Sequence, residues 1–290
     1  EGELKVLRRG HSPDRAREAL DLLLSFEFSC VNLDFIYGIP GQQTASWLDS
    51  LEEAVRFGPQ EIFLYPLYIK HGAGLEREGV VPEPEKAYAQ YREGSSFLRS
   101  KGFRQDSMRR FVRCDRETSL SGTRTFSECG FSTSLSLGCG GRSYLGDLHF
   151  CTPYAVTRED CLRELGAFET VKDFTEITHG IWLSREEEKR RYVIRHLLIR
   201  PGVNKEKYRH CFGQELLKDF PLILRWIEEG HVSEEKGGYL ALTDKGMGFS
   251  DFLGPQLISE EVQRKMAKWE EARGLGKKAH GSLQRQPEKL

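Results

Sequence analysis

The sequence lacks most of the features that identify a simple function. Its 43 Lys and Arg balance 44 Asp and Glu, and a formal net charge of −1 creates no field that recruits nucleic acid or an anionic membrane. Its longest apolar run, Ile62 to Ile69, is far shorter than the roughly 20 residues that cross a bilayer. There is no Walker loop, no G-x-S-x-G elbow and no secretory signal. We therefore expect neither nucleic acid nor a membrane as a partner.

Cysteine is scarce and scattered. The seven cysteines stand at positions 30, 114, 129, 139, 151, 161 and 211, and no two form the C-x2-C pair that commonly holds a metal. An odd number of thiols suits a reducing compartment, so we expect a cytoplasmic protein. His149, Cys151 and Cys161 are one combination that would ligate zinc, but scattered thiols in α/β cores are usually small buried hydrophobes. We predict no metal site and identify no catalytic residue.

Helix and strand patterns alternate through the first 115 residues, in a chain of 290 residues that is long enough for about two domains. Ser12 followed by Pro13 indicates a helix start, and Thr44 is a second expected cap. Helices are expected from these caps and over residues 84–100, and strands over residues 30–36, 61–69 and 102–112. This alternation predicts parallel α/β units, whose ligands bind at the carboxyl ends of the strands. Attention therefore falls on Asp34, on residues 37–42 and 65–71, and on the region near Arg109.

Asp34 is informative because it interrupts an otherwise apolar strand. Burial of a bare charge is prohibitive, so the carboxylate must be paired or must face a polar cavity. One interpretation is an ion pair with Arg9 or another basic residue. Side chains alternate along a strand, so Asn32 and Asp34 share a face, which favours the second interpretation, a lined cavity.

The middle of the chain has an unusual composition. Ten of the 19 residues over 118–136 are Ser or Thr, which predicts a long loop or a weak hairpin. A glycine-dense turn over residues 138–141 follows, and such a turn lets the backbone approach another group closely. Its spacing does not match the dinucleotide-binding pattern.

The pattern becomes helical from Ser184, which forms a capping box with Glu187. Helices over 205–212 and 220–229, and a hairpin formed by 231–233 and 238–242, complete a predicted winged-helix-like domain. The helix over 220–229 is apolar, with one Arg and two Glu, and residues 182–246 have an excess of only two positive charges. A helix that reads DNA needs basic and amide side chains, so we predict packing rather than DNA binding. Beyond Met266 a polar, frayed tail is expected.

Longer motifs are spread over residues 5–260. The segments are Arg9-Gly10-His11-Ser12, Leu33-Asp34-Phe35-Ile36-Tyr37-Gly38-Ile39-Pro40-Gly41-Gln42, Leu64-Tyr65-Pro66-Leu67-Tyr68-Ile69, Leu137-Gly138-Cys139-Gly140-Gly141-Arg142-Ser143-Tyr144 and Leu242-Thr243-Asp244-Lys245-Gly246. Together they resemble the oxygen-independent coproporphyrinogen III oxidase family of radical S-adenosylmethionine (SAM) proteins, which includes haem chaperones. The segment from Asp34 to Gln42 is close to the family's D-L-I-Y-G-L-P-G-Q.

The resemblance implies an α/β fold: a partial parallel (β/α)6 radical-SAM barrel over residues 1–170, a winged-helix-like domain over 171–257 and a helical or disordered tail over 258–290. It also implies SAM and a [4Fe–4S] cluster as cofactors of the full-length protein. Arg9 corresponds to an arginine that meets the SAM carboxylate, and Asp34 to an acid that accepts hydrogen bonds from SAM hydroxyl or ammonium groups. Tyr68 and Tyr144 fall at family positions that contact the cofactor region.

One family feature is missing from this sequence. The family binds its cluster through C-x3-C-x2-C, and no such triplet occurs here. Cluster iron needs thiolates that are presented together, so we expect no cluster in this chain and no activity from it alone. The first residue is Glu1 rather than Met and the match begins in the middle of the barrel, which favours a C-terminal portion over a degenerate member.

The sequence thus predicts the C-terminal portion of a coproporphyrinogen oxidase-like radical-SAM protein. The resemblance implies that the full-length form uses a 5′-deoxyadenosyl radical to abstract hydrogen from a small-molecule substrate, tetrapyrrole-like or related. One alternative is a haem chaperone of the same family, with His71, His149 or His179 as axial ligand. The other is a non-catalytic interaction module with a degenerate barrel.

Overall fold

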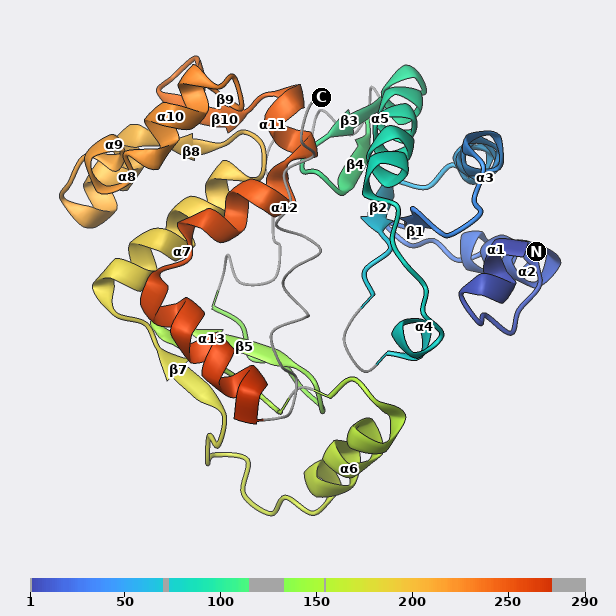
Figure 1. The fold of residues 1–290 in the computed structure, drawn as a ribbon, viewed down its shortest axis with the longest axis horizontal. Coiled ribbons are helices and arrows are strands. Elements are labelled where there is room, and N and C mark those ends of the chain that lie inside the picture. The colour runs from blue at the N-terminus through green and yellow to red at the C-terminus, as the bar shows by residue number, and fades with distance from the viewer. Residues whose placement is uncertain (1, 70–72, 115–132, 154, 273–290) are drawn as a thin grey trace.

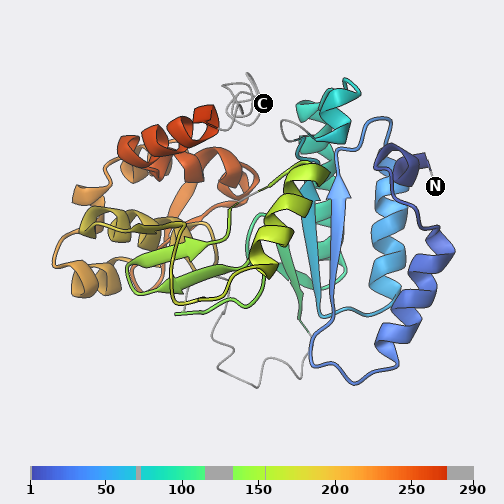
Figure 2. The same cartoon turned by 90° about the horizontal axis from the view of Figure 1, so that it is seen from below.

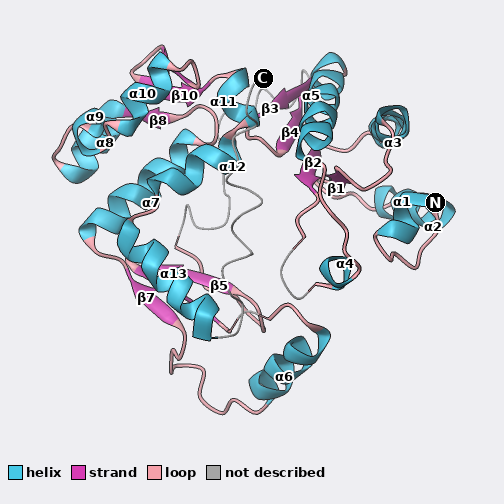
Figure 3. Cartoon of the chain, viewed as in Figure 1, coloured by secondary structure: helices cyan, strands magenta, loops and turns pink. Residues whose placement is uncertain are grey.

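The computed structural model describes residues 2–69, 73–114, 133–153 and 155–272, and within these ranges the strands form three sheets (Figures 1 and 3). The first sheet has the strand order β1-β2-β4-β3. Strands β1 (Asn32–Tyr37) and β2 (Glu61–Pro66) run parallel and are joined by helix α3 (Thr44–Arg56), as the alternating pattern predicted. This part of the fold is therefore α/β, as predicted, but within the sheet only β1 and β2 are parallel.

The predicted third parallel strand over residues 102–112 is wrong. Strands β3 (Phe103–Gln105) and β4 (Arg110–Arg113) form a hairpin, and β4 runs antiparallel to β2. Polar residues between the two strands close the turn. The Asp106 amide donates to the Arg110 carbonyl at 2.9 Å, and the Arg110 amide donates to Ser107 Oγ at 3.1 Å. Residues 102–112, predicted as one strand, thus contain a turn and form the two strands of a hairpin.

Of the two helix caps expected beside this sheet, one is present. In α2 (Pro13–Leu24), Ser12 Oγ accepts from the Arg15 amide, which confirms the predicted cap. In α3 the expected cap, Thr44, is instead the first helical residue, and Gln43 precedes it without a side-chain capping bond. Figure 2 shows α3 next to β1 and α2 farther from the sheet. The remaining helices are α1 (Gly2–Val6), α4 (Gly74–Arg77) and α5 (Pro84–Ser100).

The second sheet is antiparallel and follows the glycine-dense turn. Its strands β5 (Arg142–Leu145), β6 (Leu148–Cys151) and β7 (Gly180–Trp182) lie in chain order. Helix α6 (Arg158–Glu169) connects β6 to β7 and has no buried residue, and Figure 1 places it at the lower edge of the molecule. Most of the Ser/Thr-rich segment, residues 118–132, lies outside the described residues.

The third sheet and its helices confirm the elements predicted from Ser184 onward. The helices are α7 (Arg185–Leu197), α8 (Lys205–Phe212), α9 (Leu216–Asp219) and α10 (Leu222–Glu228). The sheet has the order β8 (Val203–Asn204), β10 (Tyr239–Leu242), β9 (Val232–Glu235), and the predicted hairpin is β9 with β10. The short β8 and α9 were not predicted. The winged-helix assignment and the domain limits stay predictions.

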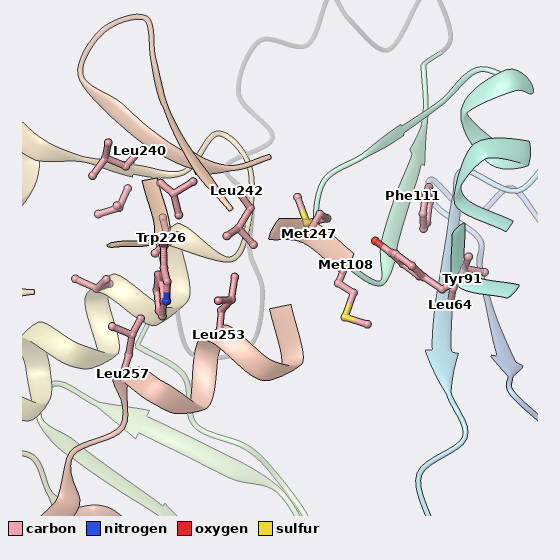
Figure 4. Close-up of a cluster of buried hydrophobic side chains, with 14 of the residues drawn as sticks. Leu64, Tyr91, Met108, Phe111, Trp226, Leu240, Leu242, Met247, Leu253 and Leu257 are labelled. Atoms are coloured by element: carbon pink, nitrogen blue, oxygen red, sulfur yellow. The ribbon is translucent and has the colours of Figure 1, made fainter. Parts of the chain in front are cut away.

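The C-terminal elements return to the first sheet. They are α11 (Asp244–Gly248), α12 (Ser250–Leu253), the 3₁₀-helix η2 (Gly254–Leu257) and α13 (Glu260–Ala272). The frayed tail expected beyond Met266 is wrong as far as Ala272, where α13 ends, and residues 273–290 lie outside the described residues. One buried hydrophobic cluster joins the first sheet to these helices. In Figure 4, Met108 and Met247 lie between Leu64 and Phe111 on one side and Trp226 on the other.

No helix within the described ranges is long and apolar enough to cross a membrane.

Candidate functional site

A cavity of about 770 Å³ lies between β1 and helices α1 and α2, and we call it the β1 cavity. Its apolar wall comes from one face of α2 and from β1, and includes Ala16, Ala19, Leu20, Leu23, Leu33 and Phe35. Its ionisable residues include both acids and bases and are Glu3, Arg9, His11, Arg15 and Asp34. The volume falls within the roughly 300–1,000 Å³ of small-molecule sites. Arg9 and Asp34, two residues singled out from the sequence, thus line one cavity.

Asp34 is exposed, so its carboxylate is not a bare buried charge. In the described part of the chain β1 pairs with β2 alone, so its other edge is open. Asn32 Nδ2 donates to Asp34 Oδ1 at 2.7 Å, which confirms that the two side chains share a face. No ion pair between Asp34 and Arg9 forms among the described residues, so the arrangement favours the lined cavity over the structural ion pair.

The turn after β1 is held by glutamine side chains. The Gly38 amide donates to Gln42 Oε1 at 3.1 Å and to Gln90 Oε1 at 2.9 Å. Gly38 has φ of +77°, and a Cβ at this position would lie 2.9 Å from Ala87 Cβ, so only glycine fits. Gln42 is itself buried, at 4% exposure. The end of the D-L-I-Y-G-L-P-G-Q-like motif therefore fixes the backbone beyond the carboxyl end of β1.

Tyr68 lies in a different cavity. This second cavity, of about 360 Å³, is bounded by Tyr68 and Arg109 from the first sheet region and by residues of α7, α12 and η2, and we call it the interface cavity. Arg109 Nη2 donates to the Tyr68 hydroxyl at 2.7 Å and pairs with Asp251 Oδ1 at 2.5 Å, and the Tyr68 hydroxyl donates to Asp251 Oδ2. Burial, and next the negative charge of Asp251, raise the pKa of Tyr68 far above its usual value, so the phenol keeps its proton.

Tyr144 lies on β5 in the second sheet. Its ring meets the His149 ring edge-on, with centroids 4.7 Å apart, and the Arg191 guanidinium lies 4.7 Å from the Tyr144 centroid. Burial, followed by the positive charges of Arg191 and Arg195, lowers the pKa of His149 to about 4. His149 is therefore neutral at pH 7. Its Nε2 is buried and has no hydrogen-bond partner among the described residues.

The four residues predicted to contact the cofactor thus occupy three places. The structure brings Arg9 and Asp34 together, but Tyr68 and Tyr144 line neither the β1 cavity nor a common site. Sequence reasoning missed Asp251, which completes the cluster around Tyr68. The partners of Asp251 stand 142 and 183 positions earlier in the sequence, so no nearby residue indicates its role. The one local signal is that the polar pair Ser250-Asp251 stands between Phe249 and Phe252.

Metal ligation gains no support from the described residues. Within these ranges no group of three or more His, Cys, Asp or Glu side chains is placed to hold a metal ion. The zinc combination of His149, Cys151 and Cys161 is therefore not brought together. His71 and Cys129 lie outside the described residues. The described residues also present no clustered thiolates, so they do not fit a [4Fe–4S] cluster.

Comparison with known proteins gives this arrangement a context, although no family model matches the sequence. Radical S-adenosyl methionine domain-containing protein 1, mitochondrial, of Bos taurus is 34% identical over 149 residues, which are 48% of this chain and 32% of that protein. Heme chaperone HemW of Mycobacterium tuberculosis is 39% identical over 74 residues, 26% of this chain and 19% of that protein. The chain thus spans well under half the length of these relatives.

The fold matches a solved radical-SAM enzyme. Coproporphyrinogen III oxidase (HemN) from Escherichia coli superposes with a TM-score of 0.69 at 19% identity, over 88% of this chain and 61% of that chain. The homologues of this chain are therefore radical-SAM domain-containing proteins, HemW haem chaperones and oxygen-independent coproporphyrinogen III oxidase. The resemblance carried by the sequence motifs is confirmed.

Proposed function

We propose that this chain is the C-terminal portion of a coproporphyrinogen III oxidase-like radical-SAM protein and that its β1 cavity holds SAM. The observation that carries the proposal is the convergence of Arg9 and Asp34 on one cavity of about 770 Å³. Arg9 and Asp34 would hold SAM, and bound SAM would supply a reactive sulfonium as the source of a 5′-deoxyadenosyl radical for hydrogen abstraction in the full-length protein. The substrate class proposed is tetrapyrrole-like or related.

The residues of the β1 cavity divide into two roles. The Arg9 guanidinium binds the SAM carboxylate, since a planar fork of N–H donors matches two carboxylate oxygens. Asp34 accepts hydrogen bonds from the SAM hydroxyl or ammonium groups, and Asn32 Nδ2 orients it by occupying Oδ1 at 2.7 Å. The apolar face of α2 excludes water from the rest of the ligand. These residues bind and orient, and none of them is placed as a proton donor or a nucleophile.

Calorimetric titration of the 290-residue chain with SAM tests this assignment. Asp34→Asn should raise Kd about ten- to 150-fold, the range for a hydrogen bond to a charged group. The melting temperature should not change, because Asp34 is exposed. Asp173→Asn is the matched control, since Asp173 is an exposed carboxylate bonded to Thr175 outside the cavity. An unchanged Kd in Asp34→Asn would overturn the SAM site, and the interaction-module alternative predicts no SAM binding at all.

A haem chaperone is the second candidate, and His149 is the observation that favours it. Its Nε2 is buried without a partner in the described ranges, and its low pKa keeps the ring neutral, the form that binds iron. Haem titration followed at the Soret band should show at least a ten-fold weaker Kd for His149→Ala. His210→Ala on α8 is the control, and His179→Ala tests the other described candidate. Equal haem affinity in His149→Ala and the control would exclude this ligand.

The cytoplasmic location stays a prediction, because relatives from Bos taurus, Mus musculus and Danio rerio are named mitochondrial.

A further inference from the structure

The interface cavity contains a polar corner that the proposed SAM site does not use. It opens just beyond the carboxyl end of β2, the side of a parallel pair where ligands bind in open α/β sheets. Tyr68 and Arg109 contribute from the sheet region, while Ser250 and Asp251 contribute from α12. Figure 1 shows α12 between α7 and the first sheet. The cavity is therefore shared by two parts of the chain that are distant in sequence.

One nitrogen of the Arg109 guanidinium is hydrogen-bonded, and the other two can donate to a ligand. Its Nη2 group makes both observed bonds, to Tyr68 and to Asp251. A guanidinium has five N–H donors, so the Nε and Nη1 groups retain three that have no partner among the described residues. Asp251 and Tyr68 thus hold the guanidinium in place without using all of its donors.

Ser250 adds an independent unsatisfied group. The residue lines the same cavity, is 5% exposed, and its Oγ is buried with no hydrogen-bond partner in the part of the chain described. A buried hydroxyl without a partner is less favourable than one that is hydrogen-bonded. Such a group is expected where a ligand completes the bonding.

The remaining lining selects among ligand chemistries. Ile194, Leu198, Pro255 and Ile258 give the cavity an apolar wall. Among the lining residues that the structure describes, Arg109 is the one cation, and Asp251 lies 2.5 Å from it. A phosphate dianion would face this carboxylate with insufficient compensation. A monoanionic carboxylate on an apolar body matches one guanidinium, one hydroxyl and an apolar wall.

We propose that the interface cavity binds the carboxylate of an apolar ligand, with Arg109 Nη1 and the Ser250 hydroxyl as donors and Asp251 as the residue that positions Arg109. Only the identity of that ligand rests on the proposed function. If the substrate is tetrapyrrole-like, the bound group is one of its carboxylate side chains. The body of the ligand then extends from the interface cavity along the carboxyl ends of β1 and β2.

Two probes test the inference in the 290-residue chain. Coproporphyrin III, followed by fluorescence, presents carboxylates on a tetrapyrrole, and its tetramethyl ester is the uncharged control. The small probe is 4-phenylbutyrate, followed by ligand-observed NMR, with its amide as control. Arg109→Gln should raise the Kd of the two carboxylates about ten-fold or more, and Ser250→Ala should raise it about three-fold. Neither variant should change binding of the ester or the amide.

Arg225→Gln removes an exposed arginine from α10 and is the matched control. If Arg109→Gln does not fold, Arg109→Lys and Ser250→Ala replace it, and each should raise the Kd of the two carboxylates by a smaller factor. Equal Kd values in Arg109→Gln and Arg225→Gln, or no binding of either carboxylate, would overturn the subsite. Binding of phenylbutyrate that depends on Arg109, without binding of coproporphyrin, would support the subsite and remove the tetrapyrrole part of the proposed function. The SAM-binding part of the proposed function is tested separately, by titration of the β1 cavity with SAM.

Discussion

Arg109 and Asp251 form an ion pair with an N···O distance of 2.5 Å between residues that stand 142 positions apart in the sequence. Arg109 directly precedes β4, and Asp251 lies on α12. The two side chains are 33% and 23% exposed, so the pair lies at the boundary between the first sheet and the C-terminal helices. The contact therefore joins two parts of the chain and positions a cavity residue at the same time.

Replacement of Asp251 should weaken this junction. Asp251→Asn leaves Arg109 without its counter-charge and should lower the free energy of unfolding by about 1–2 kcal/mol, since both partners are partly buried and the amide still accepts a hydrogen bond. Urea unfolding measures the change. Asp244→Asn is the control, because Asp244 is 75% exposed at 3.7 Å from Arg200, and it should change stability by less than about 0.5 kcal/mol. Equal losses in the two variants would contradict a structural role for the pair.

Gly94 should be intolerant of a methyl group although it lies inside a helix. A Cβ at Gly94 of α5 would lie 2.8 Å from Trp47 Nε1, and Trp47 is 1% exposed and donates from Nε1 to the Gln90 carbonyl at 3.0 Å. Gly94→Ala should therefore destabilise the protein by about 1–3 kcal/mol through overpacking. Gly166→Ala in α6 should stabilise by about 0.5–1 kcal/mol, because nothing lies within 4 Å and alanine favours a helix. Thermal unfolding of both variants checks the opposite signs.

His149 should make stability depend on pH over a defined window. Burial, then Arg191 and Arg195, lower its pKa from 6.5 to about 4. Between these values the unfolded chain binds a proton that the folded chain does not, so this contribution to stability falls as the pH decreases from 6.5 towards 4. His149→Gln removes the contribution, and its stability should fall less steeply over this range. Urea unfolding at several pH values compares the slopes, and identical slopes would show that His149 does not titrate as described.

Local signals predicted the secondary structure around their own positions well. The caps at Ser12 and Ser184 depend on bonds to residues three positions later, and both bonds are present. The parallel pair of β1 and β2 also followed from local alternation. The hairpin of β3 and β4 was not predicted, because the bonds of Asp106 and Ser107 to Arg110 closed a turn within an apparently continuous strand pattern.

The site was only partly predictable, for a physical reason. Arg9 and Asp34 are 25 positions apart and line one cavity, and their motifs identified both. Tyr68 has its partners Arg109 and Asp251 at 41 and 183 positions, so no pattern in the sequence indicated that its hydroxyl is occupied. The exposure of Asp34 could not be read from the sequence, since an apolar strand pattern is the same whether or not its second edge is paired.

The distribution of cysteines leads to a prediction for iron binding. A [4Fe–4S] cluster needs thiolates that are presented together, and of the cysteines that the structure describes, Cys30, Cys139 and Cys161 are partly buried while Cys114, Cys151 and Cys211 are exposed. Cys139 Sγ lies 3.9 Å from Thr152 Oγ1, and no described metal-binding group includes it. Anaerobic reconstitution of the 290-residue chain with iron and sulfide should therefore give no stoichiometric cluster absorbance.

A [4Fe–4S] ferredoxin reconstituted in parallel controls for the chemistry, and iron analysis complements the spectrum. About four irons per chain, retained after desalting, would contradict the prediction. In that case Cys→Ser substitution at Cys139, Cys151 and Cys161 would identify the ligands. Loss of the cluster in all three variants would mean that the glycine-dense turn, β6 and α6 assemble a site on binding iron. Retention of iron only when an upstream segment with C-x3-C-x2-C is supplied would instead support the proposal that this chain is one portion of a longer radical-SAM protein. SAM affinity measured in the same two preparations would then show whether the β1 cavity binds its ligand without the cluster, because Arg9 and Asp34 are present in both.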